Sequence, residues 1–373
     1  MTFYVKNQRF LSAGLLLLLL IAVGYGLSGV SKKTEADFSA IEIKINCSGA
    51  IGRSSEYLGS REVCYAKQFQ KVASAKGAEF AFNLLSKLQD LDPGAKGCHL
   101  IAHGIGWGIY EHNPADWQNQ IRSVNQGCTY GAVHGIIEKL VAALPEKKMT
   151  DELMLSICGK NPRADCNHII GHLLVVETRG NVDEALRRCQ IFTENRQKDF
   201  CYTGVFMEYQ TALNLIVHGI APKEWLNWPK RVGELEKMCR SYDGLKAEAC
   251  WEEIVHAALV KFDNKAERIF AFCSTAPLTN AVKRCRKHSI GIMAAGVNFN
   301  LASIKDICQL PQKDDSDFET ECYRQLAASA ISSLPQDRQR VEKFCLGLLK
   351  KFQDSCLFVL TLTDANGKIP VQN

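Results

Sequence analysis

Histidines occur in this sequence at spacings that could serve a metal ion. His99 and His103 stand four residues apart, and so do His168 and His172. On a helix, histidines at i and i+4 lie on one face and can present both imidazoles to the same metal. Imidazole-rich sites suit zinc, iron or copper, and the pattern does not choose among these ions. We therefore take six residues as candidate metal ligands, namely His99, His103, His134, Glu138, His168 and His172.

Several histidines share a position relative to a preceding cysteine. His134, His172 and His256 each stand six residues after a cysteine, and His103 stands five residues after one. At about 100° per residue, such positions project toward one side of their helices. If these helices stack, their imidazoles line one surface, and Glu138 shares that face because it follows His134 by four residues.

The segment around His172 is apolar on every side. Residues 169–176 are all apolar or glycine apart from His172, which predicts a helix buried all round. A buried imidazole needs partners for both nitrogens or loses its charge. Three interpretations stay open: a metal site, other acid–base chemistry, or a framework in which histidines hydrogen-bond the backbone of the next unit, with Glu138 as a local partner. No GxSxG or HExxH motif occurs, so we assign no catalytic residue and leave enzyme activity open.

The cysteines predict the architecture that must position these side chains. From Cys189 onward they form pairs whose members stand 11 to 14 residues apart, and the second members follow one another by 49, 35, 37 and 34 residues. A period near 35 residues is typical of stacked helical hairpins. It resembles the period of TPR-like and Sel1-like repeats, whose consensus residues are absent here. We predict an all-α solenoid of helical hairpins, each stapled by a disulfide. The regular pairs are Cys189/Cys201, Cys239/Cys250, Cys273/Cys285, Cys308/Cys322 and Cys345/Cys356. Cys158/Cys166 fits as a shorter pair, and Cys47/Cys64 and Cys98/Cys128 are further possible pairings.

Each predicted unit is a helix, a polar turn and a second helix. Glycines recur inside the second helices, for example at Gly104 and Gly135. Because a glycine within a helix costs about 1 kcal/mol relative to alanine, we expect neighbouring helices to approach closely at these positions. We predict histidine-rich repeats over residues 61–180 and plainer repeats over residues 181–360. Strand signals are scarce: the stretch 40–48 alternates briefly like a strand, and residues 356–364 are ambiguous.

The N-terminus indicates export. Residues 1–9 are basic, and residues 10–30 form a run of 21 residues without a charge, about enough to cross a membrane as a helix. We expect either an uncleaved single-pass anchor, with residues 1–9 in the cytoplasm, or a cleaved signal segment that leaves a secreted protein. In both cases the body lies in the periplasm or extracellular space, where an even number of cysteines favours disulfides. Residues 31–60 would then be a linker and N-terminal cap, and residues 361–373 a flexible tail.

Charge and the remaining features define two candidate functions. The formal net charge is +5, but the first 33 residues carry four basic groups and no acid, so the body is nearly neutral and offers no field for nucleic acid. One unit is longer, and its insertion at residues 218–231 contains Trp225 and Trp228, in a place where repeat proteins often bind partners. We expect a membrane-tethered module that binds a protein or peptide. The alternative is a metal-binding protein or metal-dependent enzyme that uses the histidine-lined site.

Overall fold

The computed structural model describes ten stretches of the chain, residues 40–49, 61–95, 98–124, 127–145, 148–158, 164–211, 232–297, 299–310, 316–333 and 338–361. Within these stretches the regular structure is entirely helical and contains no strand, which confirms the all-α class. The strand-like alternation at residues 40–48 was misleading, because residues 40–46 are helical. Ala40, Ile43 and Cys47 are its buried side chains, and spacings of three and four residues place them on one helix face.

Nine helices, which we call the row helices, pack against one another in chain order. They are α2 (Arg61–Lys76), α4 (His99–His112), α6 (Gly131–Ala142), α8 (Ala164–Glu177), α10 (Asn195–Thr211), α13 (Gly244–Glu253), α16 (Thr279–Gly296), α18 (Phe318–Ser333) and α20 (Lys350–Thr361).

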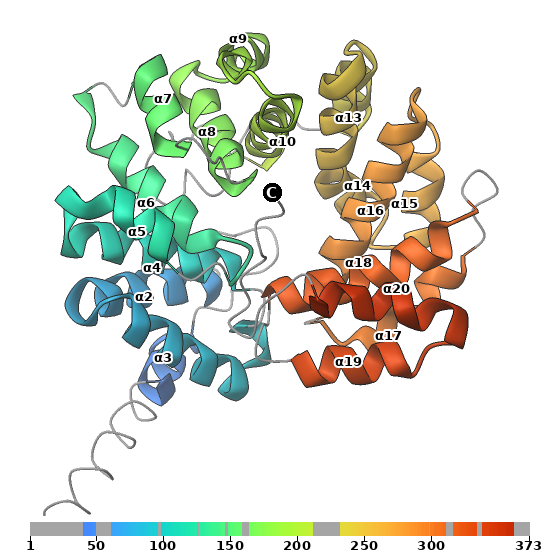
Figure 1. The fold of residues 1–373 in the computed structure, drawn as a ribbon, viewed down its shortest axis with the longest axis horizontal. Helices are drawn as coiled ribbons and strands as arrows, with labels where there is room; N and C mark the ends of the chain where they lie inside the picture. Colours follow the sequence, from blue (N-terminus) through green and yellow to red (C-terminus); the bar gives the residue numbers. More distant parts are fainter. Residues whose placement is uncertain are drawn as a thin grey trace, which may run out of the picture.

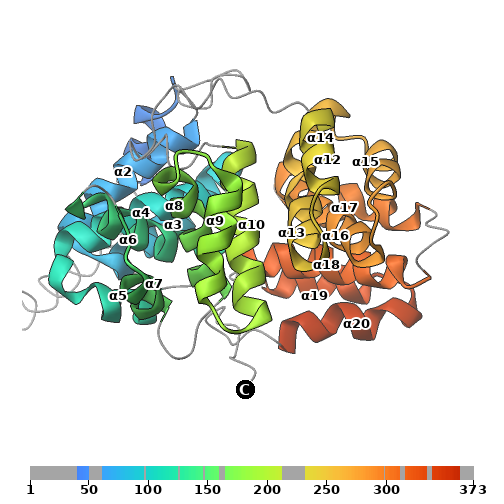
Figure 2. The same cartoon turned by 90° about the horizontal axis from the view of Figure 1, so that it is seen from above.

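The remaining helices flank this row. They are α3 (Ala78–Leu91), α5 (Trp117–Ser123), α7 (Asp151–Cys158), α9 (Val182–Arg188), α12 (Val232–Arg240), α14 (Val255–Lys261), α15 (Ala266–Cys273), α17 (Leu301–Ile304) and α19 (Arg338–Leu346), with 3-10 turns at Pro93–Ala95, Pro114–Asp116, Cys189–Ile191 and Lys305–Gln309. Figure 1 shows the helices following one another around an arc, from α2 and α3 at the lower left, past α10 at the top, to α19 and α20 at the lower right. Viewed from above in Figure 2, α2 to α10 form one half and α12 to α20 the other.

All sixteen cysteines are joined in eight disulfides, and the pairs are those that the spacing predicted. They are Cys47–Cys64, Cys98–Cys128, Cys158–Cys166, Cys189–Cys201, Cys239–Cys250, Cys273–Cys285, Cys308–Cys322 and Cys345–Cys356. From Cys158 onward, each bridge joins a row helix to the flanking segment just before it. Closing a loop of this size stabilises the fold by about 3 kcal/mol in the chain-entropy model. Eight disulfides suggest an oxidising environment outside the cytoplasm.

The buried apolar side chains form two main clusters. The first extends from Ala40 to Ala281 and takes in the row helices up to α13. The second extends from Val255 to Leu360 and is built from α14 to α20. The division that we predicted between residues 180 and 181 stays a prediction.

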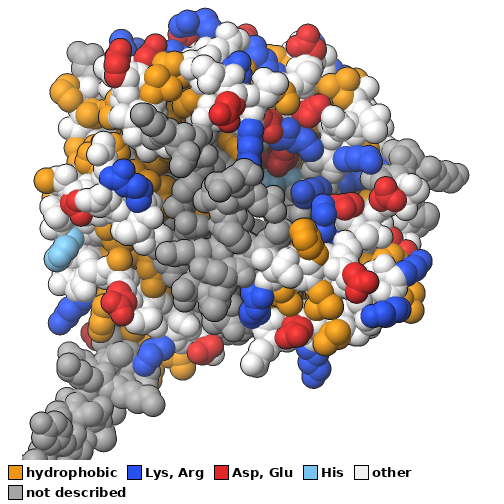
Figure 3. All heavy atoms as spheres, in the orientation of Figure 1, with side chains coloured by type: hydrophobic (Ala, Val, Ile, Leu, Met, Phe, Trp, Pro, Cys, Tyr) orange, Lys and Arg blue, Asp and Glu red, His pale blue; other side chains and the backbone are white. Residues whose placement is uncertain are grey.

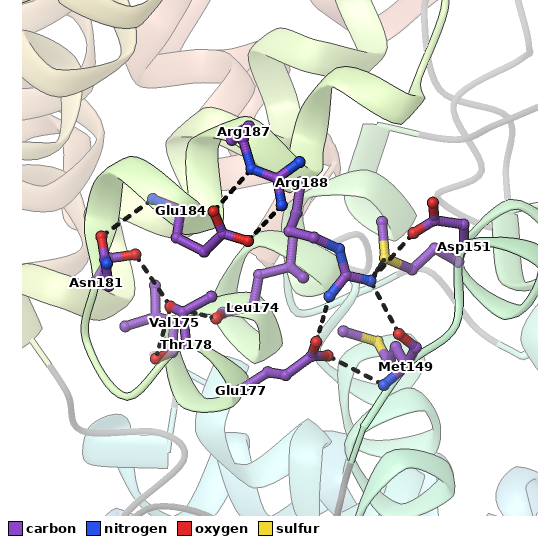
Figure 4. Close-up of polar contacts among 11 residues, drawn as sticks. Met149, Asp151, Leu174, Val175, Glu177, Thr178, Asn181, Glu184, Arg187 and Arg188 are labelled. Carbon is purple, nitrogen blue, oxygen red and sulfur yellow. Dashed lines mark hydrogen bonds and ion pairs between the residues drawn. The ribbon is translucent and has the colours of Figure 1, made fainter.

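Polar contacts fix the turn that leads from α8 into α9 (Figure 4). Arg188 binds the Glu177 carboxylate and donates a 2.9 Å hydrogen bond to the Met149 carbonyl, while Glu177 accepts a 3.0 Å bond from the Met149 amide. The Asn181 side chain accepts the Glu184 amide at 3.1 Å and so caps the start of α9. These contacts hold the end of α8, the helix that carries two of the candidate histidines.

A buried carboxylate ties the end of α3 to α2. Asp92 accepts hydrogen bonds from the Tyr65 hydroxyl at 2.7 Å, the Gly94 amide at 2.9 Å and the Arg61 guanidinium at 3.1 Å. Burial by itself would raise the pKa of Asp92, but these three donors outweigh it and lower the pKa below its usual 3.8.

We expect Asp92→Asn to lower the free energy of unfolding at pH 7 by about 1–3 kcal/mol, because buried donors lose a charged acceptor. The pKa of Asp92 is depressed in the folded state, so its contribution is complete above the unfolded pKa and is lost as the pH falls through the folded pKa. Urea unfolding at pH 7 and pH 2 should therefore show a difference between variant and parent that shrinks in acid. Asp90→Asn, at an exposed position two residues earlier, is the control. A difference that stays constant with pH would contradict this assignment.

Positive and negative side chains are interspersed on the face shown in Figure 3.

The predicted anchor at residues 10–30 and the insertion at residues 218–231 lie outside the described residues, as do residues 362–373 of the predicted tail. Within the described stretches, no helix is both long enough and apolar enough to span a membrane.

Candidate metal centre

Neighbouring row helices touch backbone to backbone around the candidate histidines. A Cβ added at Gly135 in α6 would lie 2.1 Å from the His103 carbonyl oxygen in α4, and one at Gly204 in α10 would lie 1.8 Å from the His168 carbonyl oxygen in α8. The close approach that we expected at the helix glycines is therefore confirmed. Since the backbones nearly touch, short polar side chains reach from one helix to the next.

The first histidine pair lies on α4. The Nε2 atoms of His99 and His103 are 3.1 Å apart. The Nδ1 atom of His99 lies 3.0 Å from the Cys128 carbonyl oxygen, and Nδ1 of His103 lies 3.1 Å from the Glu138 carboxylate. Glu138 is fully buried and also accepts a 3.1 Å bond from the Trp107 indole, which holds the carboxylate in place.

The second pair repeats this arrangement on α8. The Nε2 atoms of His168 and His172 are 2.9 Å apart. The Nδ1 atom of His172 lies 2.8 Å from the Glu208 carboxylate, which is fully buried. The Nδ1 atom of His168 lies 2.9 Å from the Thr203 hydroxyl, and that hydroxyl donates to the Phe200 carbonyl at 2.8 Å. The Thr203 oxygen is therefore free to accept from His168.

His134, on α6, lies between the two pairs. Its ring centroid is 5.2 Å from those of both His99 and His103, 5.8 Å from that of His168 and 6.3 Å from that of His172. The side chain is buried, and neither ring nitrogen has a hydrogen-bond partner among the described residues. Two unpaired nitrogens on a buried ring are costly. These five residues form what we call the five-histidine cluster.

The acceptors around the cluster fix the tautomers of the paired histidines. A neutral imidazole carries one N–H donor and one bare nitrogen. The backbone carbonyl, the two carboxylates and the Thr203 hydroxyl oxygen all accept a hydrogen bond from Nδ1–H, so Nδ1 carries the hydrogen in each of the four neutral rings. Each Nε2 atom then carries an unprotonated lone pair. The lone pairs of His99 and His103 face each other, and so do those of His168 and His172.

Burial favours the neutral form of three imidazoles in the cluster. Desolvation and, next, the neighbouring His103 lower the pKa of His99 to about 3, and desolvation with His172 lowers the pKa of His168 to about 3. The pKa of His134 is also well below its usual value, first through burial and then through the surrounding imidazoles. At neutral pH the side chains of His99, His134 and His168 therefore present neutral nitrogen atoms rather than cations.

The geometry fits a transition-metal ion. Ligand atoms of His99, His103 and His134 lie within 4.8 Å of one another. Two nitrogens bound to one ion at about 2.0–2.1 Å are separated by about 2.9 Å at a right angle and about 3.3 Å at a tetrahedral angle. The two Nε2 separations, 3.1 and 2.9 Å, fall close to this range. Carboxylates and carbonyls on the opposite ring nitrogen are the usual partners of metal-bound histidines.

The structure brings together all six residues that the sequence singled out, but it gives Glu138 a different place. Glu138 contacts Nδ1 of His103, on the side of the ring that faces away from the Nε2 atoms. It therefore holds the orientation of the His103 ring and does not lie beside the Nε2 atoms. His112, which sequence analysis left aside, is exposed and binds the Ser74 carbonyl at 2.8 Å.

Sequence analysis missed Glu208 and Thr203. A signal for Glu208 was present, since Glu208 follows His172 by 36 residues, as Glu138 follows His103 by 35. Both separations match the period of the cysteines, so the partner of each histidine pair lies one repeat further along. Thr203 has no comparable pattern, because its role depends on how closely α8 and α10 approach.

Comparisons with known proteins give no family for this chain. No protein-family model matches it, and neither a curated protein nor a solved structure is significantly similar to it. Its function has to be argued from the geometry of the site.

Proposed function

We propose that this chain is an exported metal-binding protein whose five-histidine cluster holds a transition-metal ion through imidazole Nε2 atoms. One observation carries this proposal. The Nε2 atoms of His99 and His103 face each other at 3.1 Å while both Nδ1 atoms are committed to oxygen acceptors. Two bare nitrogens at that distance repel each other, and a cation bound between them removes the repulsion.

Protons offer another way to remove this repulsion. An added proton on His99 is opposed by its lowered pKa. An added proton on His103 would instead form an ion pair with the Glu138 carboxylate 3.1 Å away, and His172 has the same alternative with Glu208 at 2.8 Å. A metal ion between the two Nε2 atoms of a pair removes the repulsion without a buried imidazolium, and metal analysis distinguishes the two cases.

The ligand set that the contacts support best is His99, His103 and His134, with the His168–His172 pair repeating the same arrangement toward α10. An all-imidazole set suits zinc, copper or iron. Glu138 and Glu208 would hold their histidines in the metal-binding tautomer. We propose no catalytic step, because no substrate group is indicated.

Metal analysis tests this function. The purified chain, loaded with Zn²⁺ and freed of excess by gel filtration, should retain bound metal, and His134→Ala should lose one equivalent because it removes a nitrogen from the centre of the cluster. His134→Asn, closer in size, guards against a simple packing defect, and circular dichroism shows whether each variant folds. His112→Ala, an exposed imidazole outside the cluster, is the matched control. Equal metal contents in the parent and both His134 variants would refute the proposal.

The same proposal includes a repeated helical architecture and an N-terminal segment that directs export. The unbroken order in which row helices pack, together with the hairpin disulfides, supports an α-solenoid with a period near 35 residues. The uncharged run at residues 10–30 supports attachment of the exported body to a membrane, or its secretion if the run is cleaved.

The interaction module remains a second proposal. It relies on the stacked row helices and on the insertion at residues 218–231, which lies outside the described part of the chain. The histidine geometry supports metal binding more directly.

A further inference from the structure

A second group of metal-ligating side chains lies where α13 passes into α14. The helix is interrupted at Ile254, so that Glu253 ends α13 and His256 lies in the first turn of α14. His288 reaches the same point from α16. The two imidazole Nε2 atoms are 3.3 Å apart, and they lie 3.5 and 3.6 Å from the same carboxylate oxygen of Glu253.

The carboxylate of Glu253 is the most informative member of this group. The residue is 1% exposed, and its Oε2 atom has no hydrogen-bond partner among the described residues although it lies between two imidazoles. The structure thus holds a buried carboxylate oxygen whose two neighbouring imidazole nitrogens lie beyond the usual N–H···O distance of about 2.7–3.2 Å.

The two imidazoles are partly exposed to solvent, as His99 and His168 are in the five-histidine cluster. The side chains of His256 and His288 are 23% and 28% exposed. The neighbouring cation, Arg284, is committed to other acids, since it binds Glu252 and lies 2.7 Å from Asp199. Arg284 therefore does not neutralise Glu253, and a cation can approach the three ligand atoms from the solvent side.

We propose that Glu253, His256 and His288 form a second metal site that binds a divalent transition-metal ion and keeps coordination positions open for water or a small anion. The three ligand atoms lie within 4.8 Å of one another. Their separations of 3.3 to 3.6 Å approach the value of about 3.3 Å expected for two ligands at a tetrahedral angle. Two histidines and one carboxylate with open positions are the ligand set of many catalytic zinc sites and of non-haem iron centres.

This site shares no residue with the five-histidine cluster, although His168 interacts electrostatically with Glu253 and His288, and the proposal does not rest on metal binding in the cluster. Co²⁺ is a suitable probe, because its visible spectrum reports both binding and changes in coordination. His288→Ala should lose one equivalent of Co²⁺ relative to the parent. Lys287→Ala, an exposed neighbour on the same helix, should lose none. Since His288 is partly exposed, the variant should keep the parent's melting temperature, which a thermal melt checks.

Two further measurements make the test specific. Glu253→Gln keeps the shape of the side chain but removes its charge, and it should weaken Co²⁺ binding at this site at least tenfold. Azide should change the Co²⁺ spectrum of His134→Ala, which retains the open site, and leave that of His288→Ala, which lacks it, unchanged.

The two sites can fail independently. If His288→Ala binds as much Co²⁺ as the parent while His134→Ala loses an equivalent, the second site is refuted and the first stands. If azide alters both variants equally, the claim of an open position at Glu253, His256 and His288 is wrong. Loss of one equivalent in each single variant and of both in the double variant would support two sites.

Discussion

Gly204→Ala is expected to lower the melting temperature by about 5 °C or more, or to prevent folding. The added Cβ would lie 1.8 Å from the carbonyl oxygen of His168, 2.8 Å from its carbonyl carbon and 3.2 Å from the Cα atom of Gly171. All three are backbone atoms, so no side chain can rotate away, and α8 and α10 must separate. Overpacking of this kind costs about 3 kcal/mol or more, and a chain of this size loses a few degrees for each kcal/mol.

A matched change shows whether the effect arises from contact or from glycine itself. Gly233, in the first turn of α12, has no atom within 4 Å of an added Cβ. Gly233→Ala should therefore leave the melting temperature unchanged or raise it slightly, because alanine favours helix by up to about 1 kcal/mol. A Gly204→Ala protein that melts within two degrees of the parent would mean that α8 and α10 do not approach as closely as described.

The second large effect concerns the carboxylate behind the first histidine pair. Glu138→Ala should weaken Zn²⁺ binding at the five-histidine cluster by about 10–100-fold, as loss of a hydrogen-bond partner of a ligand does elsewhere. It leaves Nδ1 of His103 and the Trp107 indole without the acceptor they share. Glu138→Gln keeps one acceptor oxygen and should lose less. Glu208→Ala should act in the same way on His172.

Competition with a coloured chelator gives the Zn²⁺ affinity of each variant. Glu111→Ala is the control, because Glu111 is an exposed acid that pairs with Lys139 on the protein surface. Parent-like affinity in Glu138→Ala would show that the carboxylate does not support a ligand. Equal losses in the alanine and glutamine variants would assign its effect to charge rather than to holding the tautomer.

Much of the architecture could be read from spacing. Disulfide geometry requires cysteines to be close, so near-equal pairs at a fixed period predict hairpins, and all eight pairs formed as expected. The glycines were equally informative, because their cost inside a helix needs an offsetting contact. Helix geometry alone predicted that the two histidines of each i, i+4 pair share a helix face, and stacking of the helices predicted that His134 lies near both pairs.

The second site could not be read in this way. His256 shares its register with His134 and His172, but His288 stands only three residues after Cys285. On uninterrupted helices of equal tilt, these two imidazoles would not be expected to meet. The two Nε2 atoms nevertheless lie 3.3 Å apart. Their approach depends on how α14 packs against α16, which the spacing from the cysteines does not encode.

The joint between α6 and α8 differs from the others around the cluster. Glycine contacts lock α4 to both α2 and α6, and α8 to α10, whereas none of the described glycines joins α6 to α8. No disulfide crosses this joint either. His134 faces His168 and His172 across it. The arc therefore consists here of two braced blocks, one that ends at α6 and one that begins at α8, and an ion that bound His134 together with His168 or His172 would bridge the joint between them.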